Sequence, residues 1–282
     1  MTEKIALLAD IHGNVGALTA VLADAAAAHA TAYWFLGDLF LPGPGAGALY
    51  AQLAAVQPQV WLRGNWEDAA LAMRRGDFEL DDPGAIYLAK LTAYLSDHAP
   101  ATMFPQIAAK PICQLVTVNG VQIQATHNLP DQDEGSSLYP AQPQANFDAL
   151  VPPTVDIAVY GHTHQQVMRT TQSGQLVINP GAVGQPYSLW PRFFADQRAH
   201  YALLTIDDAG RIDVAFRKVA YDRQQEIALA ASLKLPYWEQ YAFLRESGNT
   251  ITHDRTLLAQ VNAAQDYVNQ VAEYYHKKGS LR

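Results

Sequence analysis

Short apolar runs alternate with helix-like segments along the first part of the chain. Residues 5–9 form an apolar run that is followed by a loop and by the alanine-rich stretch 15–28, which predicts a buried strand, a loop and a helix. The same order returns at residues 33–36 and 48–56, and a third apolar run occupies residues 60–63. Buried strands that alternate with helices are typical of a mainly parallel sheet covered by helices.

The rest of the chain contains turn signals between further apolar runs. Residues 111–125 predict a hairpin that turns at Asn119 and Gly120, and residues 157–160 predict another buried strand. Two more hairpins are expected to turn near Gly174 and Gly210, and helical pieces are expected around residues 87–95. From residue 223 the pattern becomes helical, with an apolar stripe at Leu257, Val261, Ala264, Val268 and Val271. We therefore expect one domain over residues 1–220 and a packed helical appendage over residues 221–282.

Polar residues follow several of the predicted strands directly. Asp10 and His12, Asp38, and Asn65 come after the first three apolar runs. Ligand sites in sheets of this kind lie beyond the carboxyl ends of the strands, so these side chains should converge. His127 follows the second strand of the predicted hairpin. His162 and His164 follow the run at residues 157–160.

Charge and composition narrow the classes of partner. The formal net charge of -8 argues against binding to long nucleic acid or to anionic lipid, because both require clustered Lys and Arg. The single cysteine, Cys113, fits a reducing compartment and hence a cytoplasmic location. No signal-peptide pattern and no apolar run long enough to span a membrane is expected from the sequence. Formation of a homo-oligomer stays open.

Each polar motif is a weak signal by itself, but the set is specific. Asp-x-His places a carboxylate and an imidazole in one loop, a pairing suited to divalent transition metals. Gly-Asp and Gly-Asn commonly form ordinary turns, whereas Gly-His-Thr-His directs two imidazoles to neighbouring positions. The motifs occur in order, each after an apolar strand, and they supply two carboxylates, one amide and four imidazoles. Independent structural explanations for all of them are improbable.

The chain resembles the calcineurin-like metallophosphoesterase superfamily. The matching motifs are Asp10-x-His12, Gly37-Asp38, Gly64-Asn65-Trp66-Glu67, His127 and Gly161-His162-Thr163-His164. It looks more narrowly like the small bacterial and archaeal phosphodiesterase-like branch, through Gly13-Asn14, Gly43-Pro44 and the segment from Asn179 to Pro186. The resemblance covers about residues 1–220. It implies an α/β fold, a four-layer α/β/β/α sandwich with mixed sheets, here followed by the C-terminal helical appendage.

The resemblance also implies which residues hold each metal ion. Asp10, His12 and His164 would hold one metal ion, Asn65, His127 and His162 the second, and Asp38 would bridge the two. A hydroxide that bridges the two ions would be the nucleophile, with Asp38, Asn65 and His127 as the central catalytic positions. Mixed oxygen and imidazole ligands suit Mn, Fe, Zn, Ni or Co, and ligand type does not choose among them.

Trp66 is the departure from the family pattern. The family commonly has a histidine at this position, thought to stabilise the transition state or to protonate the leaving group. Indole offers one donor and no useful acid. Glu67, Asp68, His98 and His200 are candidate replacements whose distance from the metal ions the sequence does not give.

Substrate contacts are predicted from two residues and their neighbours. Asn14 follows the first metal loop, and Arg192 follows Pro191, so either is a candidate ligand of a phosphate oxygen. For Arg192 a surface ion pair explains the residue equally well. The aromatic residues around Arg192 would stack on a base if the substrate is a nucleotide, although a core or partner-surface role is favoured for them: Tyr187, Trp190, Phe193 and Phe194.

The sequence therefore favours a metal-dependent phosphoesterase that acts on a small substrate, a phosphodiester or a nucleotide. The alternative is a catalytically weak or inactive metal-binding scaffold of the same fold, which Trp66 favours and the complete ligand set opposes. A nuclease of long nucleic acid ranks last, because no dense run of basic residues is present.

Overall fold

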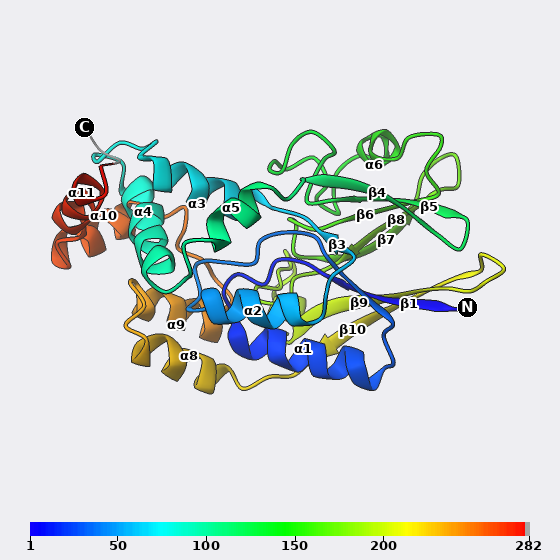
Figure 1. The fold of residues 1–282 in the computed structure, drawn as a ribbon, viewed down its shortest axis with the longest axis horizontal. Coiled ribbons are helices and arrows are strands. Elements are labelled where there is room, and N and C mark those ends of the chain that lie inside the picture. The colour runs from blue at the N-terminus through cyan, green and yellow to red at the C-terminus, as the bar shows by residue number, and fades with distance from the viewer. Residues whose placement is uncertain (280–282) are drawn as a thin grey trace.

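The computed structural model describes residues 1–279 and consists of two five-stranded sheets that face each other (Figure 1). The first sheet has the order β10-β9-β1-β2-β3. Within it, β1 pairs in parallel with β2 and antiparallel with β9, so the sheet is mixed as expected. Its strands are β1 (Glu3–Leu8), β2 (Ala32–Phe35), β3 (Val60–Trp61), β9 (Ala199–Ile206) and β10 (Ile212–Val219).

The second sheet has the order β4-β5-β6-β8-β7. The predicted hairpin over residues 111–125 forms β4 and β5, and β6 matches residues 157–160. β5, β6 and β8 run in parallel, whereas β4 and β7 are antiparallel edge strands. The strands are β4 (Cys113–Val118), β5 (Val121–Thr126), β6 (Ile157–Tyr160), β7 (Gln166–Thr170) and β8 (Leu176–Pro180).

Helices cover the outer faces of both sheets and complete the four predicted layers. In Figure 1, α1 (Val15–Ala27) and α2 (Gly47–Ala55) lie below the first sheet, and α6 (Gln144–Leu150) lies above the second. Alternate strand residues fill the space between the sheets, for example Leu7 and Trp34 from the first and Val159 from the second. Burial of both sheet faces explains why these strands read as continuous apolar runs.

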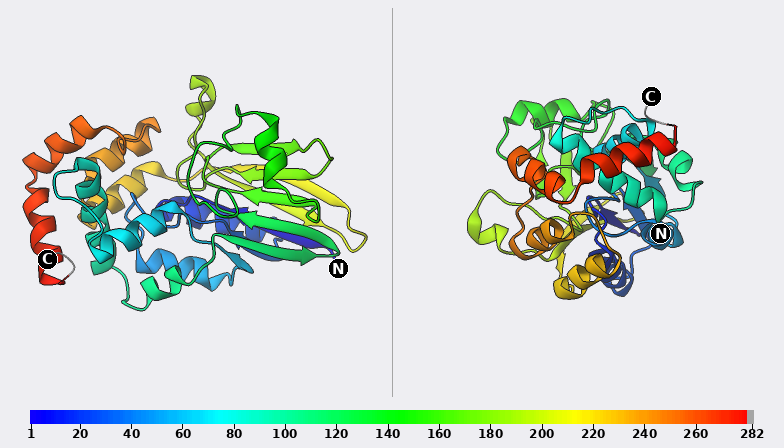
Figure 2. Two further views of the ribbon diagram at one scale, coloured as in Figure 1. Left: turned by 90° about the horizontal axis from the view of Figure 1, so that it is seen from above. Right: turned by 90° about the vertical axis from the view of Figure 1, so that its left-hand side faces the viewer.

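One end of the sandwich is covered by further helices, which we call the helical end. In Figure 1 it lies on the left, beyond the carboxyl ends of β1 and β2. Short α5 (Met103–Ala108) and α7 (Pro191–Phe194) were not expected from the sequence, and α7 projects from the molecule in Figure 2. The helical end consists of α3 (Asn65–Arg75), α4 (Pro83–Asp97), α8 (Arg223–Ser232), α9 (Trp238–Ser247), α10 (Arg255–Ala264) and α11 (Tyr267–Lys277).

The C-terminal helices share a core with the first domain, although the apolar stripe predicted for them is not continuous. Tyr241, Leu244 and Leu258 belong to the same buried cluster as residues of β1 and α1. The predicted stripe is divided between α10 and α11 by Asp266, whose φ is +53°. The boundary at residue 220 stays a prediction, and the last three residues of the predicted appendage lie outside the described part. Within residues 1–279, every helix is too short or too polar to cross a lipid bilayer.

Candidate metal centre

The loops that leave the strands carry the predicted ligands in an unusual backbone conformation. Five of the seven have a φ between 52° and 63°, in the left-handed region that residues other than glycine seldom adopt. Such conformations persist only where surrounding structure enforces them, and they cluster at functional sites. The five are Asp10, His12, Asp38, His162 and His164.

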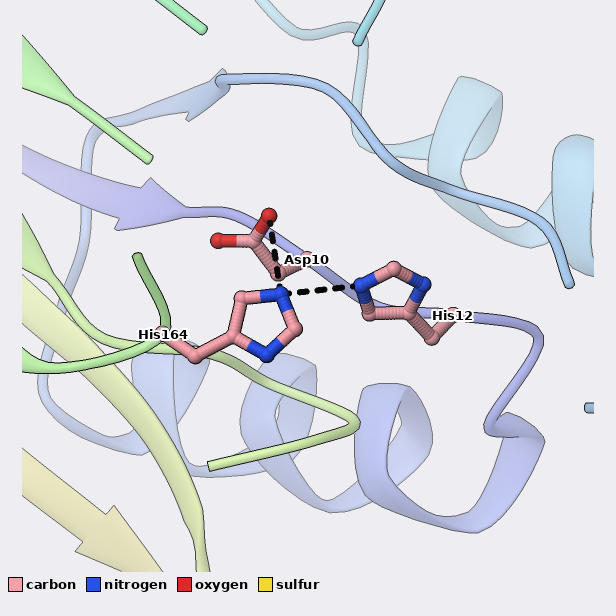
Figure 3. Close-up of side chains that lie close together, drawn as sticks. All are labelled: Asp10, His12 and His164. Carbon is pink, nitrogen blue, oxygen red and sulfur yellow. Dashed lines mark hydrogen bonds and ion pairs between the residues drawn. The ribbon is translucent and has the colours of Figure 1, made fainter. Parts of the chain in front are cut away.

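Asp10, His12 and His164 form the first group, shown in Figure 3. Nε2 of His164 lies 3.0 Å from Nε2 of His12 and 3.6 Å from Oδ1 of Asp10. One ligand atom of each residue lies within 4.8 Å of the other two. This is the set that the family resemblance assigned to one metal ion.

Asn65, His127 and His162 form the second group. Oδ1 of Asn65 lies 3.0 Å from Nε2 of His127 and 3.0 Å from Nδ1 of His162. Asn65 is the first residue of α3, so the helix rather than a strand loop positions it.

Asp38 lies between the two groups. Its Oδ2 is 3.7 Å from Nε2 of His12 in the first group and 3.5 Å from Nε2 of His127 in the second. Its Oδ1 accepts a hydrogen bond from the backbone N–H of Trp66 at 2.9 Å. This is the position that a carboxylate shared by two cations must occupy.

Backbone carbonyls fix which ring nitrogen of three imidazoles carries the proton. Nδ1 of His12 donates to the carbonyl of Leu41 at 2.8 Å, and Nδ1 of His127 donates to that of Leu36 at 2.7 Å. In His162 it is Nε2 that donates, to the carbonyl of Gly135 at 3.0 Å. A carbonyl only accepts, so a neutral imidazole held in this way turns an unprotonated nitrogen into the site.

Burial keeps these imidazoles neutral and penalises the carboxylates. Desolvation lowers the pKa of His12 to about 3, and it lowers the pKa of His127, His162 and His164 as well. Desolvation is also the main cause that raises the pKa of Asp10 and Asp38 well above the usual range. A buried carboxylate pair beside neutral imidazoles is an unfavourable arrangement unless positive charge is supplied.

The donor set fits cations. Nε2 of His127, Nδ1 of His162 and Oδ1 of Asn65 are three acceptor atoms that face one another without a proton between them. Oδ2 of Asp10 is buried and has no hydrogen-bond partner among the described residues. Divalent cations bind neutral imidazoles and carboxylates, and they favour the ionised form of both aspartates.

The segment from Asn179 to Pro186 connects the loop after β1 with the loop after β6 through hydrogen bonds. Nδ2 of Asn179 donates to the carbonyl of Gly161 at 2.6 Å, next to the predicted ligands His162 and His164. The backbone N–H groups of Val183 and Gly184 donate to the carbonyls of Ala9 and Asp10, each at 2.9 Å. This family motif therefore links the β6 loop to the β1 loop.

Glu67 organises the loop that carries Asp38. Its buried carboxylate accepts hydrogen bonds from the backbone N–H groups of Asp38 and Leu39, each at 2.8 Å, and of Gly64 at 2.9 Å. Burial raises the pKa of Glu67 to about 7. Because both carboxylate oxygens are engaged by backbone groups, Glu67 does not replace the absent family histidine.

The candidate metal centre opens into a cavity of about 830 Å³, which we call the metal cavity. Trp66 lines it, with its indole edge-on to the ring of His12 at a centroid distance of 5.5 Å. The loop between α9 and α10 forms another wall and contributes Thr250, Thr252 and His253. His253 is the one imidazole that this loop contributes to the wall. No sequence signal placed it here, because its approach depends on how the C-terminal helices pack.

The other candidate replacements for the family histidine lie elsewhere. Asp68 pairs with Arg63, and Nδ1 of His98 donates to the carbonyl of Tyr94 at 2.8 Å. His200 lies in a neighbouring cavity. Among the residues that line the metal cavity, His253 is the imidazole that belongs to neither predicted ligand group.

The two predicted substrate contacts receive no support from the geometry. Oδ1 of Asn14 caps α1 by accepting from Ala17, and its Nδ2 donates to the carbonyl of Gly184 and to the hydroxyl of Tyr221. This bonding uses all of its polar atoms and favours a structural role. Arg192 is exposed on α7 and is not among the residues that line the metal cavity.

Comparison with known proteins identifies the fold. A sequence model of the calcineurin-like phosphoesterase superfamily domain matches residues 4–209. A metallophosphoesterase from Sphaerobacter thermophilus aligns with a TM-score of 0.64 at 22% identity, over 87% of this chain and 100% of that one. A hypothetical protein from Pyrococcus horikoshii OT3 aligns with a TM-score of 0.69 at 20% identity, over 88% and 99% of the two chains. No protein with curated annotation matches the sequence.

The predicted sandwich fold is thus confirmed, and the predicted ligands lie in the loops after its strands or, for Asn65, at the start of α3. The family model spans most of the chain, ending just before β10. The chain therefore belongs to the calcineurin-like phosphoesterase superfamily and is a phosphoric ester hydrolase.

Proposed function

We propose that the protein is a metal-dependent phosphodiesterase or nucleotide phosphohydrolase that uses two divalent cations. The observation that carries this proposal is the position of Asp38, whose Oδ2 lies within 3.7 Å of an unprotonated imidazole nitrogen in each of the two ligand groups. When bound, the cations would make water nucleophilic near neutral pH and neutralise charge on the phosphoester.

The chain's own residues then have distinct tasks. Asp10, His12 and His164 would hold one cation, Asn65, His127 and His162 would hold the other, and Asp38 would be shared. The carbonyls of Leu41, Leu36 and Gly135 keep the imidazole nitrogens that face the site free of protons. Trp66 lines the cavity beside His12 and offers no acid to the leaving group.

The character of the metal cavity favours a substrate with an organic group on both sides of phosphorus. Its walls include Trp66, Leu88 and Tyr139 as well as the ligands. A cavity of about 830 Å³ lies within the range of sites for small organic ligands. An ester with a good leaving group needs no proton from the enzyme, which fits the indole at position 66.

The test is hydrolysis of a phosphoester panel by metal-free protein that is reloaded with Mn, Fe, Zn, Ni or Co. We expect hydrolysis of aryl phosphodiesters with at least one metal and loss of that activity in Asp38→Asn. Absence of hydrolysis across the panel, with the null result persisting in Trp66→His, would overturn the enzymatic proposal.

A scaffold role is the second candidate, because large apolar side chains are exposed near α7. Leu189, Trp190 and Phe193 are 62–69% exposed. An experiment distinguishes the two roles, because a scaffold of this fold would bind metal but hydrolyse none of the phosphoesters in the panel. We assign the protein to the cytoplasm on the basis of its single cysteine, Cys113.

A further inference from the structure

A second cavity of about 380 Å³ lies beside the metal cavity, at the edge of the sandwich where β7 and β10 face each other. We call it the His200 cavity. Gln166 on β7 crosses to the other sheet here, with Nε2 donating to the carbonyls of Tyr201 and Arg217. The volume is within the range of sites for small organic ligands.

Two side chains of this cavity carry polar atoms without a partner. His200 is 6% exposed, and neither its Nδ1 nor its Nε2 has a hydrogen-bond partner. Nε2 of Gln165 is buried and is likewise unpartnered. A neutral imidazole offers one donor and one acceptor, and the amide adds two donor hydrogens. Burial of unsatisfied polar groups is costly, so a ligand with a matching donor and acceptor edge would stabilise this arrangement.

The glycine at position 181 leaves space for the His200 side chain. A side chain at position 181 would approach Cβ of His200 to 2.8 Å, and glycine occupies this position with φ +76°. The imidazole is therefore seated in a space that only a glycine leaves open. Burial, followed by the charge of Lys218, lowers the pKa of His200 to about 4, so the ring is neutral at physiological pH.

The remaining walls are mainly aromatic and include the Lys218–Asp196 ion pair. Tyr187, Phe193, Phe194 and Phe216 line the cavity. Lys218 lies 3.2 Å from Asp196, which is also paired with Arg198 at 2.7 Å, so the carboxylate compensates the charge of Lys218 only in part. Stacking surfaces together with a donor and acceptor edge favour a planar heteroaromatic ring.

The two cavities are neighbours with common walls. Pro186, Tyr187 and Phe194 line both, and the rings of Tyr187 and Phe194 meet edge to face at a centroid distance of 5.7 Å. The backbone N–H of Tyr187 donates to the carbonyl of the predicted ligand His164 at 3.2 Å. The shared wall is thus attached directly to the metal centre.

We propose that the His200 cavity is a subsite for the heteroaromatic base of a nucleotide whose phosphoester lies in the metal cavity. This inference rests on the proposed function for the phosphoester half. His200 and Gln165 would bind the polar edge of the base once their side chains turn toward the cavity, because their nitrogen atoms are covered by neighbouring atoms in the structure. The aromatic side chains would stack on the faces of the base.

Nucleosides test the subsite independently of catalysis, because they carry no phosphate. Adenosine, guanosine, cytidine and thymidine, with ribose as the base-free control, would be titrated by calorimetry into the full chain with Mn²⁺ and with EDTA. We expect at least one nucleoside to bind equally in both conditions and ribose not to bind. His200→Phe should weaken binding at least about tenfold by removing the polar edge. Phe193→Ala, at an exposed position, should weaken it about 5- to 150-fold by removing a stacking surface.

His276→Phe is the matched control, because His276 is exposed on α11 and lines neither cavity. It should leave nucleoside binding unchanged. If none of the four nucleosides binds, or if binding survives both His200→Phe and Phe193→Ala, the base subsite is overturned.

Kinetics then separate the subsite from the proposed function. The p-nitrophenyl phosphodiester of the tightest-binding nucleoside is compared with methyl p-nitrophenyl phosphate, which has the same leaving group and no base. We expect His200→Phe to raise the KM ratio of the two esters about tenfold. An unchanged ratio with active enzyme contradicts the subsite alone. Nucleoside binding without cleavage of either ester contradicts the proposed function alone.

Discussion

At the scale of single residues, the site depends on how burial and backbone carbonyls set the state of each side chain. Imidazoles that donate to carbonyls on one side present a lone pair on the other, which is the form that a cation requires. The residue that departs most from the family pattern is Trp66, and its consequence is chemical rather than structural, because the indole still packs against His12.

Replacement of Trp66 by histidine should supply the absent proton donor. A positioned acid contributes about 100- to 10,000-fold to rate, so cleavage of alkyl phosphoesters should rise within that range while aryl phosphodiesters change little. The measurement is kcat for both substrate classes, with Trp66→Phe as the control that removes the indole and adds no acid. Equal rates for the two variants on alkyl esters would contradict the view that position 66 lacks a proton donor for the leaving group.

His200 should make the folded state less stable in acid. Its pKa is about 4 in the folded protein against 6.5 for an ordinary histidine, so between these pH values the unfolded chain binds a proton that the folded chain does not. Its contribution to stability is therefore complete above pH 6.5 and is lost as the pH falls toward 4. At ~1.4 kcal/mol per pH unit, the loss is about 3 kcal/mol.

Denaturant unfolding of metal-free protein at several pH values measures this effect. Lys218, Asp196 and Arg198 are the charged groups that act on His200. Other buried histidines add their own acid dependence, so the informative quantity is the difference between the wild type and His200→Phe. We expect that difference to fall between pH 6.5 and 4, and a difference independent of pH would rule out the titration of His200 as its cause.

At the scale of elements, the site is assembled by loops whose backbones are in direct contact. Gly184, in the loop after β8, lies against the β1 loop, and a Cβ at this position would meet the carbonyl oxygen of Ile11 at 1.8 Å. No side chain fits without moving a segment that carries two predicted ligands, Asp10 and His12.

Gly184→Ala should therefore destabilise the fold by about 1–3 kcal/mol and weaken metal binding. The free energy of unfolding and the number of bound ions are the two readouts. Gly84→Ala, in the first turn of α4, is the control, because its Cβ would meet only Oδ1 of Asp82 at an ordinary 3.4 Å. Similar losses in both variants would show that backbone contact at Gly184 has no special effect.

The loop between α9 and α10 should influence catalysis without holding metal. His253 lines the metal cavity but belongs to neither ligand group. His253→Ala is expected to lower kcat/KM for phosphodiesters about tenfold while the bound-metal content stays at the wild-type value. Loss of metal in this variant would mean that the loop supports the centre instead of the substrate.

At the scale of the whole molecule, the two sheets and the C-terminal helices enclose the site from three sides. The predicted ligands follow β1, β2, β5 and β6 or lie in α3, and part of the cavity wall comes from beyond the end of the family match at residue 209. Cations that bind such a site bind the folded state alone, because the unfolded chain does not hold the seven side chains together.

Metal should accordingly stabilise the folded protein. A cation at one hundred times its Kd contributes about 2.7 kcal/mol, so adding Mn²⁺ or Zn²⁺ to metal-free protein should raise the Tm by several degrees. His164→Ala and Asn65→Ala should each reduce the bound ions by about one, as measured by elemental analysis. A Tm that is insensitive to every metal in the panel would contradict a dinuclear centre.

The sequence by itself determined the strands, their alternation with the first helices, and the set of polar residues that follow them. Apolar periodicity is a local property, so the hairpin at Asn119 and the strand β6 are readable from it. The seven predicted metal ligands also stand out as a set, because such residues in order after strands have no common structural explanation; their role as ligands stays a prediction.

Only the tertiary structure decided how the predicted residues are used. Asn14 is a helix cap, and the histidines that sequence reasoning passed over or misplaced, His253 and His200, line cavities. The reason is physical: cavities form where segments distant in the chain pack together, and neither their walls nor the burial that sets a side chain's pKa is encoded in a local pattern.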